Sequence, residues 1–90
     1  MATVRIPSSL RSFTKGESEV QAQGATVREI FDDLEKHHPG LKERICAPAG
    51  NVLRHVNVFV SGDDIRFLQD LATPVEDNAE IDITPALAGG

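Results

Sequence analysis

Apolar and polar residues alternate along four stretches of the chain, and this period of two is typical of half-buried β-strands. The clearest run, HVNVFVS at 55–61, places its three valines on one face and Phe59 on the other. Prolines follow the first and last runs and end them, because proline cannot continue a hydrogen-bonded ladder. We predict these strands over residues 2–6, 18–23, 55–61 and 81–84.

Between the last two of these runs, the pattern predicts a turn, a short strand and a second turn. Gly62-Asp63 starts the first turn. Ile65 and Phe67 alternate around Arg66, which predicts a short returning strand with Ile65 and Phe67 on the same side. Asp77-Asn78 predicts a turn that tolerates a left-handed residue.

A period of 3.6 residues runs through 26–38 and predicts the main helix. Thr26 is a favourable N-cap, and Glu29 three residues later completes a capping box. Pro39-Gly40 ends the helix, and residues 41–45 predict a short helical turn over one end of the core. The apolar stripe of the helix consists of Val27, Ile30, Phe31 and Leu34.

One amphipathic helix cannot bury its stripe alone, so it requires the apolar face of the sheet. The order strand, strand, helix, strand, short strand, strand therefore predicts an α+β fold of the ubiquitin-like β-grasp type, with a mixed sheet of about five strands on one main helix. We predict a β-grasp domain over residues 1–85 and a flexible tail over 86–90. The sheet residues expected in the core are Val4, Ile6, Val20, Val56, Val58, Val60, Ile81 and Ile83.

The charge of the chain is unevenly placed. Its net charge is −5, and all of the excess negative charge lies in the second half. That half contains seven acidic residues and only two basic ones, Arg54 and Arg66. This argues against nucleic acid, which requires a basic face. Either an electropositive protein partner or a solvated acidic surface explains the pattern. With no apolar run long enough for a membrane span and no secretory signal, we expect a cytoplasmic protein without membrane contact.

The interior offers no credible active site. Neighbouring carboxylates do not converge, and two adjacent histidines on a helix point too far apart to clamp one metal ion. The lone Cys46 is expected to be an inert free thiol. The groups considered and set aside are Asp32-Asp33, Asp63-Asp64, Glu76-Asp77, His37-His38, His55 and Ser8-Ser9.

The tail differs from the rest of the chain. Five residues extended from the sheet reach roughly 16–18 Å, which is enough to enter the active site of another enzyme. Gly89 and Gly90 have no side chains and can pass a narrow channel, and a carboxylate on Gly90 is a chemical handle. A frayed terminus is the plain alternative. We expect residues 86–90 to be mobile in the free protein.

Four stretches resemble the sulfur-carrier family of ubiquitin-like β-grasp proteins, which includes the small subunit of molybdopterin synthase, the thiamine sulfur carrier and the carrier of cysteine biosynthesis. They are VNVFV at 56–60, DIRF at 64–67, LATPV at 71–75 and ITPALAGG at 83–90, and the last is the most specific. The long segment before the central strand makes the chain most similar to the cysteine-pathway carrier, and next to the molybdopterin type. Asp77-Asn78 stands where the family often has Asp-Gly, which changes only turn preference.

The resemblance implies a protein cosubstrate rather than an enzyme. A ubiquitin-activating-like enzyme would use ATP and magnesium to adenylate the carboxylate of Gly90, with Gly89 beside it. A thiocarboxylate would then form on Gly90 and donate sulfur to a synthase, a cysteine synthase first and a molybdopterin-forming one second. The chain itself would bind no cofactor or metal and would be monomeric when free. Partner contacts are expected from Phe59, Pro85, Ala86, Leu87 and Ala88.

Two readings of the same fold and tail stay open beside the carrier. One is a protein modifier linked to target lysines through Gly90, and the other is a non-catalytic interaction domain. The role of Phe59 is open too. We expect Phe59 and Leu87 to form an apolar patch that docks the activating enzyme, unless the 7–14 loop covers Phe59 through Leu10 or Phe13 and the ring serves stability alone.

Overall fold

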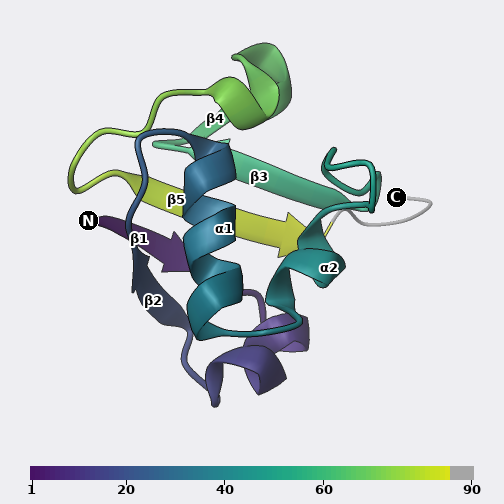
Figure 1. Ribbon diagram of the computed structural model, residues 1–90. Helices are drawn as coiled ribbons and strands as arrows, with labels where there is room; N and C mark the ends of the chain where they lie inside the picture. The colour runs from purple at the N-terminus through teal and green to yellow at the C-terminus, as the bar shows by residue number, and fades with distance from the viewer. Residues whose placement is uncertain (86–90) are drawn as a thin grey trace.

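The computed structural model describes residues 1–85 and consists of a mixed five-stranded sheet with α1 packed across one face (Figure 1). The strands lie in the order β2-β1-β5-β3-β4. Strand β5 is central, parallel to β1 and antiparallel to β3, and β1 forms an antiparallel hairpin with β2. This is the predicted β-grasp arrangement. The strands are β1 (Ala2–Arg5), β2 (Glu19–Ala22), β3 (Val56–Val60), β4 (Asp63–Asp64) and β5 (Glu80–Pro85), and the helices are α1 (Val27–His37) and α2 (Leu41–Ile45).

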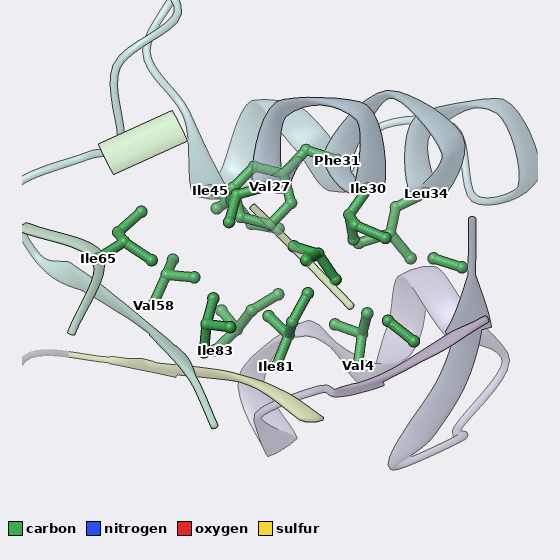
Figure 2. Packing of buried hydrophobic residues seen from close by; sticks show 14 of the residues in the cluster. Val4, Val27, Ile30, Phe31, Leu34, Ile45, Val58, Ile65, Ile81 and Ile83 are labelled. Atoms are coloured by element: carbon green, nitrogen blue, oxygen red, sulfur yellow. The ribbon is translucent and has the colours of Figure 1, made fainter. Parts of the chain in front are cut away.

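The core lies between α1 and the sheet. Figure 2 shows the stripe of α1 pointing toward valine and isoleucine side chains of the strands. All eight sheet residues expected in the core are buried, and so are the four stripe residues. Each fully buried aliphatic or aromatic side chain contributes about 1.5–3 kcal/mol relative to exposure. The period-two and period-3.6 patterns therefore identified the core correctly.

The start of α1 differs in one detail from a reciprocal capping box. Thr26 is the N-cap, and its hydroxyl accepts the N–H of Glu29 at 3.3 Å, as predicted. The Glu29 carboxylate, however, accepts the N–H of Ala25 at 3.0 Å rather than that of Thr26. Thr26 forms a β-bridge with Pro74, so the 73–75 segment ties down the entry to the helix. The helix start is thus fixed by both local and long-range bonds.

The predicted strand around Ile65 and Phe67 is wrong. Strand β4 contains only Asp63 and Asp64, and the chain then forms two 3₁₀ turns, η2 (Ile65–Phe67) and η3 (Asp70–Ala72). The Asp64 carboxylate caps η2 by accepting the N–H of Arg66 at 2.8 Å, which turns the chain away from the ladder. Ile65 enters the core while Phe67 points to solvent, so the two do not share a face.

Two connections between the elements, the 7–14 loop and the turn at Asp77-Asn78, complete the fold. The 7–14 loop contains a 3₁₀ helix, η1 (Ser8–Thr14), which the sequence pattern did not predict. Its last residue, Thr14, is buried and donates its hydroxyl to the carbonyl of Glu17 at 2.8 Å. The turn at Asp77-Asn78 is as predicted, with Asn78 in the left-handed region at a φ of 66°.

Candidate functional site at the end of strand β5

Strand β5 leads the chain out of the sheet toward its C-terminal residues. Pro85 is the last residue of β5, is exposed, and pairs with Val56 of β3. Strand β1 pairs with β5 only as far as Asp82, so the last residues of β5 are held in the sheet by β3 alone. The predicted site residues Ala86, Leu87, Ala88, Gly89 and Gly90 lie outside the described residues, as does the expectation of a mobile tail.

A groove of about 260 Å³ lies beside this exit, between the 7–14 loop and the ends of β3 and β5. Leu10 and Val56 make its walls apolar, and the basic side chains of Arg44 and His55 also line it. Arg44 lies 5.5 Å from the centre of the Phe13 ring, a cation–π distance that orients the guanidinium. The base of the tail therefore leaves the sheet next to an apolar groove that carries two basic side chains.

Phe59 lies on the open face of the sheet, opposite α1, and is half-buried. It lines a shallow hollow with Pro7, Asp82 and Thr84. Within residues 1–85, neither Leu10 nor Phe13 lines this hollow, and both pack against the core. The docking role of Phe59 stays a prediction.

Arg5 forms ion pairs with three carboxylates on the same open face. Its guanidinium lies 2.8 Å from Glu80, 3.5 Å from Asp82 and 3.6 Å from Glu19, on the two strands that flank β1. These groups are exposed or half-exposed, so each pair adds little to stability. Their effect is to neutralise part of the acidic second half where it meets the sheet face.

Arg66 holds the outer edge of β3, a contact that the sequence analysis missed. Its guanidinium donates to the carbonyl of Val56 at 2.7 Å and to the Asn57 side chain at 2.8 Å. Strand β4 pairs only with Phe59 and Val60, so Arg66 occupies the part of the edge that β4 leaves open. The sequence feature that could have indicated this contact is Arg66 itself, one of only two basic residues in the acidic second half of the chain.

The paired carboxylates on α1 have separate partners, and the thiol of Cys46 is buried. Asp32 pairs with Lys42, whereas its neighbour Asp33 accepts the N–H of Gln23 at 2.9 Å, so the two carboxylates do not converge. Burial raises the pKa of the Cys46 thiol, against the opposing effect of Lys42. Within residues 1–85, no three or more histidine, cysteine or carboxylate groups are placed to hold a metal ion. Nor has any helix in that range the length and apolar character to cross a membrane.

Comparisons with known proteins point to one family. The family model described as the ThiS family matches residues 4–90. The sulfur carrier protein CysO of Mycobacterium tuberculosis is 41% identical over 90 residues, covering 98% of this chain and 97% of that protein. A chain in the crystal structure of the Amycolatopsis orientalis BexX/CysO complex superposes with a TM-score of 0.93 at 44% identity, with both chains fully covered. The small archaeal modifier protein 1 of Methanosarcina acetivorans has a TM-score of 0.84 at 27% identity, covering 99% of this chain and 95% of that one.

Proposed function

Since the chain belongs to the ThiS family, we propose that it is a sulfur carrier protein whose reactive group is the C-terminal carboxylate of Gly90. The observation that carries the proposal is the family match, which runs through the whole β-grasp domain to Gly90. The similarity to CysO over nearly the full length of both chains supports the same function. Cysteine biosynthesis is the pathway that this similarity favours.

The chemistry follows from the poor reactivity of a carboxylate. An activating enzyme joins the Gly90 carboxylate to AMP from ATP, with magnesium, and releases pyrophosphate. A sulfide donor then attacks the acyl carbon, AMP leaves, and a thiocarboxylate remains on Gly90. The thiocarboxylate sulfur is a nucleophile at neutral pH, and a synthase accepts it. Because activation consumes ATP, we expect this cycle in the cytoplasm.

We propose a division of labour between the chain and its partners, and the described residues support it. Cys46, the single thiol of the chain, is buried, and the carboxylate pair on α1 is tied to local partners. The chain therefore acts as a protein cosubstrate, and the partners supply ATP binding and general acid–base groups. Residues 86–90 follow the end of β5 in the chain, and the neighbouring apolar groove and open face offer surfaces for docking.

Intact mass measurement tests the proposal directly. The full chain is incubated with ATP, magnesium, sulfide and the adenylating enzyme of the same organism. We expect a mass gain that corresponds to replacement of one oxygen by sulfur. Deletion of Gly90, or addition of residues after it, should abolish this gain and leave the melting temperature unchanged, because Gly90 follows the folded domain. Normal sulfur incorporation by the chain that lacks Gly90 would refute the carrier function.

A protein modifier is the alternative that the names of some relatives raise, such as the small archaeal modifier protein. A modifier shares the adenylation step but ends as an isopeptide on a target lysine. The same incubation with cell extract separates the two, since a carrier accumulates the thiocarboxylate and a modifier gives adducts of higher mass. We expect the thiocarboxylate.

A further inference from the structure

Phe67 and Leu68 form an exposed apolar patch outside the open face of the sheet. Phe67 is 87% exposed and Leu68 is 44% exposed. Among residues 1–85, the one other large apolar side chain that is exposed to solvent is Met1. A phenylalanine with most of its surface in water is uncommon in a soluble domain and indicates a binding role. We call these two residues the 67–68 patch.

The backbone under the patch is held in place. Ile65 and Leu71, on either side, are buried in the core. The N–H of Leu68 donates to the carbonyl of Ile65 at 3.0 Å, and that of Gln69 donates to the buried Thr73 hydroxyl at 3.0 Å. The patch therefore results from anchored turns and not from a loose loop, and little conformational entropy is lost when it binds.

The 67–68 patch and Phe59 belong to different parts of the fold. Phe59 lies on the open face of β3, whereas η2 and η3 fold past the β3 edge toward the side of the sheet that α1 covers (Figure 1). Figure 2 shows Ile65, the first residue of η2, beside Val58 in the core on that covered side. The turns that carry the 67–68 patch therefore lie beyond the β3 edge, apart from the open-face position of Phe59.

The charges around the patch indicate the kind of partner. Asp63 and Asp70 are exposed beside it, and Asp64 lies at the start of η2. The neighbouring basic residue is Arg66. Its guanidinium donates a hydrogen bond to the carbonyl of Val56 in β3 and lies 3.8 Å from the Asp64 carboxylate. An apolar anchor framed by carboxylates fits an apolar pocket rimmed by lysine or arginine. Anionic membrane surfaces repel such a frame.

We propose that the 67–68 patch is the anchor for the sulfur-accepting enzyme, through an apolar pocket with a basic rim. The proposal rests on the proposed function, since a carrier must leave its activating enzyme and be taken up by an acceptor. Both enzymes need the same C-terminal residues, so contacts elsewhere must distinguish them. An anchor on η2, beyond the β3 edge and apart from Phe59, gives the acceptor a contact that the activating enzyme does not use.

The test compares Phe67→Ser with the matched control Gln69→Ala, an exposed side chain two residues away. Binding of the full chain to the cysteine synthase of the same organism is measured by calorimetry, and thiocarboxylate formation is measured by mass. We expect Phe67→Ser to weaken acceptor binding about tenfold or more, as for an aromatic hot spot, with Leu68→Ser weakening it less. Gln69→Ala, the melting temperature and thiocarboxylate formation should be unchanged.

Three results with the variants or the wild-type chain would overturn the proposal, in addition to a simple absence of binding. They are unchanged acceptor binding by Phe67→Ser, a loss of activation with acceptor binding intact, and self-association of the wild-type chain that Phe67→Ser abolishes. Absence of binding between the wild-type chain and the synthase also refutes it. Failure of the carrier function itself is distinguishable, because the wild-type chain would then form no thiocarboxylate.

Discussion

Cys46, the single thiol of the chain, is 5% exposed, and burial raises its pKa. Since the thiolate is the reactive form, we expect iodoacetamide at pH 8 to label the urea-unfolded chain and to spare the folded one. The raised pKa also predicts a pH effect. Below the ordinary pKa of a thiol the free energy of unfolding is unaffected, and above it the free energy should fall, because the unfolded chain loses the proton first.

The control for both effects is Cys46→Ala. This variant should show no labelling and a smaller fall in unfolding free energy between pH 8 and pH 10 than the wild type. Rapid labelling of the folded wild-type chain, at a rate close to that of the unfolded one, would mean that the thiol is available for chemistry.

Phe59 is the residue on which the docking of the activating enzyme is predicted to depend. Because the ring is half-buried on the open face, Phe59→Ala should cost less stability than the roughly 3–5 kcal/mol typical of a core phenylalanine. It should weaken binding to the activating enzyme by more than about 1 kcal/mol, as for a hot-spot aromatic. Calorimetry and thermal unfolding measure the two effects.

The matched control for Phe59 is Phe31→Ala. Phe31 is 1% exposed in the core and should show the full loss of stability. A large loss of stability for Phe59→Ala, with unchanged binding by the folded fraction, would give Phe59 a purely structural role.

At the scale of elements, the outer edge of β3 is only partly covered by the neighbouring strand. Strand β4 covers only two residues of this edge, and Arg66 bonds to the carbonyl beyond them. We expect Arg66→Ala to lower the free energy of unfolding by about 1–2 kcal/mol, because bonds from a charged donor are lost but the carbonyl can reach water. The open edge should also promote self-association.

Urea unfolding and sedimentation velocity measure these two consequences. Arg54→Ala is the matched control, since it removes the same charge from an exposed position just before β3. If the two substitutions have equal effects, the loss of stability and the self-association result from the removed charge and not from exposure of the β3 edge.

At the scale of the whole molecule, the asymmetry of charge should affect association rates. The second half of the chain carries the excess of negative charge, and Arg5 offsets part of it on the sheet face. We expect the association rate with the activating enzyme to fall as salt rises, because steering by complementary fields is screened. Glu76→Gln together with Asp77→Asn should slow association and leave dissociation nearly unchanged.

Stopped-flow measurement at several salt concentrations provides the test. A control pair, Glu17→Gln with Glu43→Gln, removes two exposed carboxylates from the neutral first half and should slow association less. A rate that does not depend on salt would mean that the acidic surface serves solubility alone.

The sequence by itself determined the elements with strong periodicity and the family. The alternating runs and the stripe of α1 allow one placement of the apolar side chains, since a shift by one residue would expose them. The prediction of function rests on Gly89-Gly90 in the segment after Pro85. This prediction needs no tertiary structure, because it depends on the chemistry of the residues and not on their packing.

Only the tertiary structure decided the arrangement of residues 63–73. Ile65 and Phe67 fit a strand by local pattern, but a run of three residues cannot distinguish a strand from a 3₁₀ turn. Burial of Ile65 beside Val58 and capping by Asp64 turned the chain, exposed Phe67 and brought Arg66 onto the β3 edge. The Asp64 cap is local, but the burial of Ile65 and the bonds of Arg66 join residues of different elements, so their energies enter only when the sheet is assembled and local sequence does not encode them.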